Sequence, residues 1–233
     1  MLTSNAFRLM AVQAVIFTPD HGSFSQSSAL ATLLGRYSQR FNGPVQALPL
    51  PEDVPAEVPR ILLRSSDQAW SLQAGPARID SFWHLRDLSS AAPDDVVARC
   101  VEVLAHYVES THTTAARLAV VITRASQVPE PARLLVSHFC NEESQQRLFR
   151  DSVNFEIHNH KRHLLPGGPE VNSWVRCKTG HLSVSEAPVL LVEQDVNTVE
   201  EIAYPNQFDP QGISDYFQRA AAETDSILQV YFP

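Results

Sequence analysis

The fold is decided by the run Phe155-Glu156-Ile157-His158-Asn159-His160-Lys161-Arg162-His163, whose even-numbered positions carry Glu156, His158, His160 and Arg162. In a β-strand, successive side chains point to opposite faces of the sheet. These four side chains would therefore line one surface. The run predicts a strand with one polar, histidine-bearing face.

Two further runs extend this pattern toward the C-terminus. In residues 171–178, one face carries Asn172, Trp174, Arg176 and Lys178, and the other carries Val171, Ser173, Val175 and Cys177. Residues 188–195 begin apolar and turn acidic at Glu193 and Asp195. Three such strands predict a sheet with a charged face, and a charged sheet face of this kind usually has a partner.

Outside this region, apolar runs and helical spacing place the other elements. Strands are expected over residues 9–17, 45–50, 60–65, 68–74, 79–85 and 117–124, and helices from about Ser27, over 93–107, over about 130–150 with a break near Asn141, and from Asp209-Pro210. The helix over residues 93–107 has the clearest pattern, because Val96, Cys100 and Leu104 lie on one apolar stripe with their neighbours.

The order of these elements predicts an α+β fold within a single domain of residues 1–233. It consists of antiparallel sheet, continuous or in two parts, with helices packed on one face. Residues 9–110 and 117–231 each read as a strand, a helix, several antiparallel strands and a long amphipathic helix. This shared order suggests two similar halves, although no residue-level repeat accompanies it. The second sheet face is then free to be solvated or to bind something.

The composition favours a soluble cytoplasmic protein. Its 233 residues are 44% hydrophobic and carry a formal net charge of −8, which argues against general nucleic-acid binding. Cys100, Cys140 and Cys177 lack the paired spacing of a zinc site or a disulfide framework. No segment has the pattern of a signal peptide or the length of a membrane span, so no membrane contact is expected. With 8 glycines and no phosphate loop, the chain is expected to hold no cofactor.

Several strand patterns carry a resemblance to a known family. They are residues 153–179 with the run Val171-Asn-Ser-Trp-Val-Arg-Cys-Lys178, the strand at 189–195, the closing helix to Phe232, and the strand at 60–64 followed by Trp70. In these features the chain resembles a sporadically distributed, functionally uncharacterised bacterial family of about this length. The resemblance covers most of the chain and implies no activity, cofactor or catalytic residue. The patchy distribution hints at phage defence or toxin–antitoxin modules.

His158 and His160 are the candidate metal ligands, because His-x-His on a strand places two imidazoles on one face. A third ligand would have to come from Glu156, Glu193 or Asp195, since His163 falls on the opposite face. Solvated strand histidines are the simpler interpretation, and no metal site is predicted. No catalytic signature is present: Gly-x-Ser-x-Gly is absent, and no catalytic residue is predicted.

The sequence leads to a non-enzymatic binding or regulatory subunit of a bacterial multi-protein system, which engages another protein subunit or a copy of itself through the polar sheet face. The binding residues would be Glu156, His158, His160, Arg162, Trp174, Arg176 and Lys178. One alternative is a small-ligand or nucleotide sensor around Arg162, Trp174 and Arg176, where guanidinium groups and an aromatic plane suit an anion or a base. A second is a metal-dependent hydrolase that uses His158 and His160.

Overall fold

The computed structural model describes residues 2–19, 21–51, 53–86, 88, 91–93, 95–200 and 208–233. The strands are β1 Arg8–Phe17, β2 Gln46–Ala47, β3 Ile61–Arg64, β4 Trp70–Ala74, β5 Arg78–His84, β6 Arg117–Gln127, β7 Glu156–Leu164, β8 Glu170–His181 and β9 Pro188–Thr198. The α-helices are α1 Gln26–Tyr37, α2 Val96–Thr111, α3 Pro131–Phe139, α4 Glu142–Arg147 and α5 Pro210–Tyr231, with short 3-10 turns η1 Ser4–Ala6 and η2 His21–Ser23.

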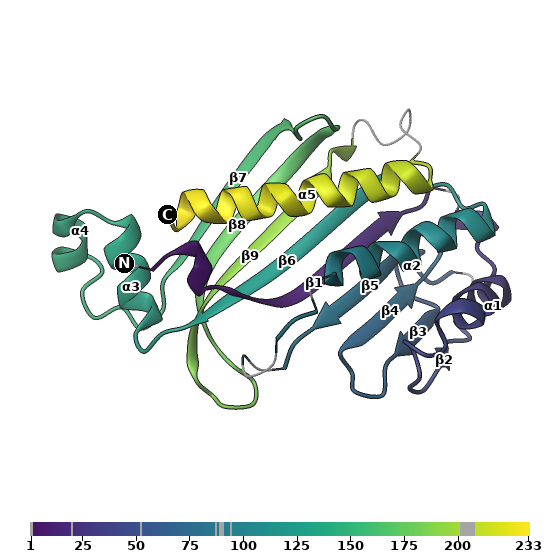
Figure 1. The fold of residues 1–233 in the computed structure, drawn as a ribbon, viewed down its shortest axis with the longest axis horizontal. Helices are drawn as coiled ribbons and strands as arrows, with labels where there is room; N and C mark the ends of the chain where they lie inside the picture. The colour runs from purple at the N-terminus through teal and green to yellow at the C-terminus, as the bar shows by residue number, and fades with distance from the viewer. Residues whose placement is uncertain are drawn as a thin grey trace.

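All nine strands form one antiparallel sheet in the order β2-β3-β4-β5-β1-β6-β9-β8-β7 (Figure 1). The prediction of an α+β fold with antiparallel sheet is confirmed. The first strands of the two stretches 8–111 and 117–231, β1 and β6, pair at the centre of the sheet. From β1 the order runs outward through β5, β4, β3 and β2, and from β6 through β9, β8 and β7, so on both sides the strands follow in reverse of their order in the chain. A common origin of the two stretches stays a prediction.

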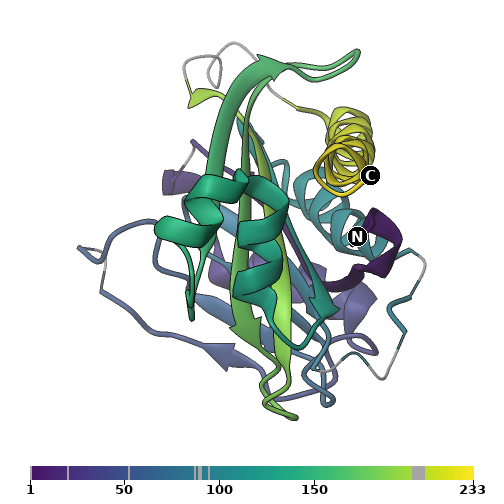
Figure 2. The same cartoon turned by 90° about the vertical axis from the view of Figure 1, so that its left-hand side faces the viewer.

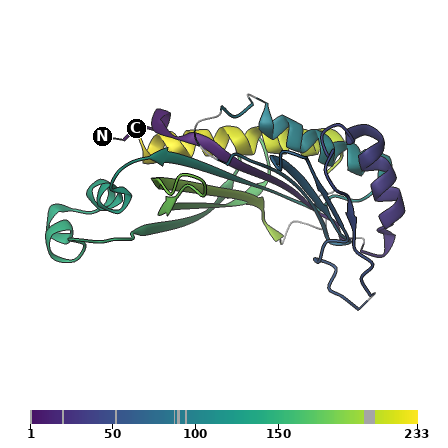
Figure 3. The same cartoon turned by 90° about the horizontal axis from the view of Figure 1, so that it is seen from below.

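The long helices α2 and α5 lie on the same side of the sheet (Figures 2 and 3). They and α1 bury apolar side chains against it, and one core cluster joins Leu33 of α1, Leu104 of α2, Phe217 of α5 and Ile122 of β6. α3 covers the end of β8 and β9, where Leu135 packs with Cys177 and Val192 in a second cluster. Burial of these apolar surfaces holds the two layers together.

Two expected elements differ from the structure. The helix over residues 93–107 instead spans Val96–Thr111, because Asp95 rather than Pro93 precedes the first helical turn and His112 ends the helix in a left-handed conformation with φ 54°. The strand expected over residues 45–50 shrinks to Gln46–Ala47. Pro44 and Pro49 flank it closely, and proline has no N–H group to give to a sheet ladder.

A buried polar network attaches α5 to the sheet. The guanidinium of Arg124 on β6 donates to Gln194 Oε1 on β9 (2.6 Å), to Thr224 Oγ1 (3.3 Å) and to the carboxylate of Asp225. The amide of Gln194 donates onward to the carbonyl of Thr224 (2.7 Å). Burial lowers the pKa of Arg124 and the charge of Asp225 opposes that shift. The network satisfies polar groups that would otherwise be costly to bury.

None of the helices in the described part of the chain is both long enough and apolar enough to cross a membrane.

Candidate functional site

The sheet face opposite α2 and α5, here called the open face, carries the seven residues that the sequence singles out. Strands β7 and β8 place them in cross-strand register as Glu156 with Lys178, His158 with Arg176, His160 with Trp174, and Arg162 with Asn172. Their neighbours Val171, Ser173, Val175 and Cys177 are buried under the helices. The alternation in the sequence therefore brings the polar side chains of both strands to one surface.

Trp174 is the centre of this surface. Its indole ring stacks on the imidazole of His160, with ring centroids 4.0 Å apart and 7° between the planes. The guanidinium carbon of Arg176 lies 5.6 Å from the centroid of the indole. His160 is also held by Asn172, whose Oδ1 lies 3.2 Å from Nε2. The aromatic group is thus fixed before any ligand arrives, which lowers the entropy lost on binding.

The charges around Trp174 are already paired within the chain. Arg176 donates to Glu193 Oε1 at 2.5 Å, and Lys178 to Glu193 Oε2 at 3.4 Å. Farther along the face, Arg162 Nε lies 3.0 Å from Glu170 Oε1 and His158 Nε2 lies 2.6 Å from Glu156 Oε1. Because every one of these basic groups has an acidic neighbour, the surface is a mixed-charge patch and does not form a basic groove.

Two neighbouring carboxylates of β9 have opposite pKa shifts. Burial raises the pKa of Asp195, and a hydrogen bond from the Asn197 amide (2.9 Å) only partly opposes this. Burial acts on Glu193 in the same direction, but the hydrogen bond from Arg176 and the charge of Lys178 outweigh it, so the pKa of Glu193 is lowered. Asp195 lies directly opposite Trp174 in the β8–β9 register. It is thus a carboxylate with little ionic compensation beside an aromatic ring.

The structure also bears on the metal ligands considered from the sequence. His158 contacts Glu156, whereas His160 stacks on Trp174, and Glu193 is engaged by Arg176 and Lys178. His163 lies on the helix side, with Nε2 3.2 Å from Glu223 Oε1 of α5. Among the described residues, no group of three histidine, cysteine or acidic side chains could hold a metal ion.

The open face continues onto the central strands, which the sequence reasoning did not single out. There the ring of Phe17 on β1 lies between two guanidinium groups, 5.3 Å from that of Arg78 and 4.9 Å from that of Arg117. Asp80 pairs with Arg78 and accepts a hydrogen bond from Gln13 (2.8 Å). The alternation of Gln13, Val15 and Phe17 in β1 is the signal that would have placed Phe17 on this face.

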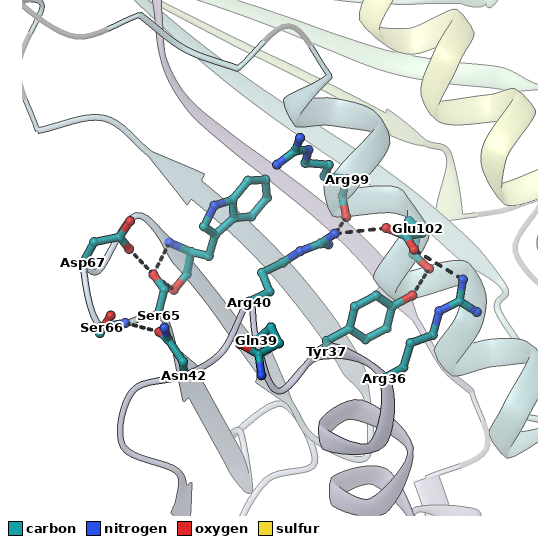
Figure 4. Close-up of a pocket in the computed structure, with 11 residues that line it drawn as sticks. Arg36, Tyr37, Gln39, Arg40, Asn42, Ser65, Ser66, Asp67, Arg99 and Glu102 are labelled. Carbon is teal, nitrogen blue, oxygen red and sulfur yellow. Dashed lines mark hydrogen bonds and ion pairs between the residues drawn. The ribbon is translucent and has the colours of Figure 1, made fainter.

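A cavity of about 520 Å³ lies on the helix side, between the end of α1, the β3–β4 turn and α2 (Figure 4). Its centre is Arg40, whose guanidinium carbon lies 5.1 Å from the ring of Tyr37 and 5.2 Å from that of Trp70. Arg40 donates to the carbonyl of Arg99 (2.8 Å) and to Glu102 (3.0 Å).

A second arginine of this cavity, Arg36, shares the same acid, with Nη2 3.4 Å from Glu102 Oε1. Burial and then the Glu102 charge raise the pKa of Tyr37 to about 12, so its hydroxyl stays protonated and donates to the carbonyl of Glu102 (3.2 Å). Arg36 and Arg40 together carry one positive charge more than Glu102, which favours a small organic anion as a ligand of this cavity. No pattern in the sequence predicts this cavity, because its walls come from three separate segments.

Comparisons with known proteins add little to this geometry. No family model and no curated protein matches the chain. Among solved structures, the di-domain ARO/CYC StfQ from the steffimycin biosynthetic pathway is similar at 9% sequence identity and a TM-score of 0.21, over 95% of this chain and 95% of that one. A TM-score this low carries no argument about fold or function.

Proposed function

We propose that this chain is a non-enzymatic binding or regulatory subunit that engages a protein partner through the open face of its sheet. The observation that carries the proposal is the fixed Trp174, stacked on His160 and flanked by Arg176 among the polar residues of β7 and β8. Aromatic and arginine side chains dominate the binding energy of protein interfaces, most of all where their neighbours hold them in place.

The composition of the open face supports a protein partner over a nucleic acid. Its strands present the aromatic residues Phe17, Phe82 and Trp174, and five arginines against the single lysine Lys178; the arginines are Arg64, Arg78, Arg117, Arg162 and Arg176. Protein interfaces are enriched in aromatic residues and arginine and depleted in lysine. A nucleic-acid site would instead need uncompensated positive charge, whereas most of these arginines have acidic neighbours and the chain carries a net charge of −8.

The resemblance to a sporadically distributed bacterial family adds a setting to this proposal. In that setting the partner is another component of the same multi-protein system, encoded by a gene next to its own. Membership in the family and a role in phage defence or a toxin–antitoxin module stay predictions. These two predictions decide only which proteins are tested as partners.

The test is co-expression of the tagged chain with the products of its neighbouring genes, followed by isolation of a stoichiometric complex. Trp174→Ala should abolish the complex while the variant stays folded. Arg147→Ala is the matched control, since Arg147 lies on α4 in an exposed pair with Glu143 (2.7 Å), away from the open face. A complex that survives Trp174→Ala, or the absence of any complex, would remove the proposal.

The cavity beside Arg40 favours a second candidate, a sensor of a small organic anion such as a carboxylate or a phosphate ester. The alternative in the sequence placed such a pocket around Arg162, Trp174 and Arg176. The arginines of both places already pair with acids of the chain, so the choice of the Arg40 site rests on its concave walls. A thermal-shift screen with nucleotides and phosphorylated metabolites tests the Arg40 cavity. A rise of several degrees that is lost in Arg36→Ala would support a sensor, and an unchanged melting temperature across the panel would eliminate it.

A further inference from the structure

The strand β7 forms one margin of the sheet (Figure 1), and within the described residues no strand pairs with its outer side. β7 has nine residues, all of them in register with β8, whereas β2 at the opposite margin has two. An edge strand presents a row of backbone N–H and C=O groups that can pair with another chain. The long edge of β7 is thus the larger docking site for a further strand.

The turn between β7 and β8 shows which backbone groups point outward. Leu165 N–H donates to the carbonyl of Pro169 at 2.9 Å, so residues 165 and 169 form a hydrogen-bonded pair of the antiparallel ladder. Such pairs alternate along a ladder with non-hydrogen-bonded pairs. Odd-numbered residues of β7 therefore bond to β8. The N–H and C=O groups of the even-numbered residues Glu156, His158, His160, Arg162 and Leu164 point away from it.

The side chains on this edge are complementary to those of a second, antiparallel copy of the same strand. When Glu156 of one copy faces Arg162 of the other, His158 faces His160 and Asn159 faces Asn159, as the two-fold symmetry of such a pair requires. Each Glu156 then faces an Arg162 across the two copies, in addition to its contact with His158 and to the contact of Arg162 with Glu170 inside one chain. No carboxylate faces a carboxylate, and no guanidinium faces a lysine or arginine. This register also pairs even-numbered residues with each other, as their outward backbone groups demand.

Exposed apolar side chains at the two ends of β7 fit the same register. Leu164, its last residue, is 73% exposed, and Val153, just before the strand, is 85% exposed. In this register Leu164 faces Asn154 of the other copy, beside its Val153. At each end of this contact between two β7 strands, here called the seam, one Leu164 and one Val153 are covered. Removal of these apolar side chains from water favours the pairing.

We propose that two copies of this chain associate through antiparallel pairing of their β7 strands, centred on Asn159, so that the two sheets become one continuous sheet. The seam needs only this chain, and it stands whether or not the open face binds another protein. The mass of the pure protein in solution reports on the seam, whereas the co-expression experiment reports on the open face.

The first test measures molar mass by light scattering over a concentration series. The wild-type chain should have twice the mass of one chain at micromolar concentration. His160→Pro removes an outward N–H from each copy but leaves the bonds of Asn159 and Lys161 to β8, and it should raise the dimer Kd about tenfold or more. His160→Ala is the matched control, because it keeps that N–H, and it should remain a dimer.

The second test exchanges charges across the seam and does not depend on tolerance of a proline. Arg162→Glu places carboxylates opposite each other twice and should give a monomer, and the double variant Glu156→Arg with Arg162→Glu should restore the dimer. Melting temperatures of all variants separate lost pairing from lost folding. A monomeric wild-type chain, or a dimer that ignores His160→Pro and both charge variants, would overturn the proposal.

Discussion

The imidazole of His160 on β7 lies flat against the indole of Trp174 on β8, with their planes 7° apart. Neither ring is part of the hydrophobic core, which lies on the other side of both strands. An aromatic stack outside the core is available for binding, because it can be removed at little cost to the fold.

We therefore expect substitutions on the open face to weaken partner binding with little effect on the stability of the fold. Replacement of Arg162 and Arg176 together by Ser should lower the free energy of unfolding by no more than about 1 kcal/mol, because both are partly exposed ion-pair members. The same double variant should lose its protein partner. Urea unfolding measures the first quantity and co-purification the second; a stable variant that still binds the partner would return this face to a merely solvated surface.

In contrast to the open face, substitution of Arg124 should destabilise the fold. Arg124→Ala leaves Gln194 Oε1 without its donor in the buried layer between α5 and the sheet, and should lower the free energy of unfolding by about 1–3 kcal/mol or more. Arg147→Ala, which breaks an exposed pair of α4, should cost less than about 1 kcal/mol in the same denaturation experiment. Equal losses in the two variants would mean that the Arg124 network does not hold α5.

The apolar C-terminus makes a third prediction. Phe232 is fully buried between Phe7 (4.7 Å between ring centroids) and His138 (5.0 Å), and its carbonyl accepts a hydrogen bond from Ser4 N–H (2.7 Å). Phe232→Ala should therefore lower the free energy of unfolding by about 3–5 kcal/mol.

Val230→Ala is the control for this third prediction, because Val230 is 78% exposed only two residues away and should be close to neutral. Calorimetry distinguishes the two variants. A soluble, fully stable chain that lacks residues 225–233 would show that this docking is dispensable.

The fourth prediction concerns Asp195, whose contribution to the stability of the fold should fall as pH rises. Because burial raises its pKa in the folded state, its contribution to stability is present below the unfolded pKa of about 3.9 and is lost as pH rises through the folded value. Asp195→Asn never ionises and can still accept the hydrogen bond of Asn197. It should therefore raise the melting temperature near neutral pH, and raise it less at about pH 4.

Glu193→Gln is the counterpart of opposite sign. Burial raises the pKa of Glu193, but the contacts with Arg176 and Lys178 outweigh it and leave the pKa lowered. Its contribution is present above the unfolded pKa and is lost on acidification. Glu193→Gln should therefore lower the melting temperature near neutral pH. If both substitutions shift it in the same direction, the contrast between the two carboxylates is wrong.

Local periodicity predicted most of the sheet, because alternation reports directly on which face of a strand is buried. The side chains from Glu156 to Arg162 and from Asn172 to Lys178 share the face that the alternation gave them. The break near Asn141 was also visible in the sequence, since Asn141 caps α4 through a hydrogen bond to Ser144 N–H.

Long-range contacts were beyond the reach of the same reasoning. Arg124 and Asp225 meet across 101 positions of the chain, and the cavity beside Arg40 needs Trp70 and Glu102 to come together. Such contacts depend on how helices cross the sheet, and no periodic pattern reports on that. Spacing along the chain does not fix the register between strands, so it could not assign Arg162 to Glu170 or Arg176 to Glu193.

The central pairing of β1 with β6 has a consequence for how the protein is made. β1 pairs with β5 on one side and with β6 on the other. β5 ends at His84, whereas β6 begins only at Arg117. During synthesis on the ribosome, strands β1 to β5 can pair with one another before β6 is made, and the ten residues of β1 then have one side unpaired. Until β6 emerges, β1 is an edge strand with unpaired backbone groups, although it lies at the centre of the final sheet. Nascent chains that meet at this stage are prone to pair with each other through it.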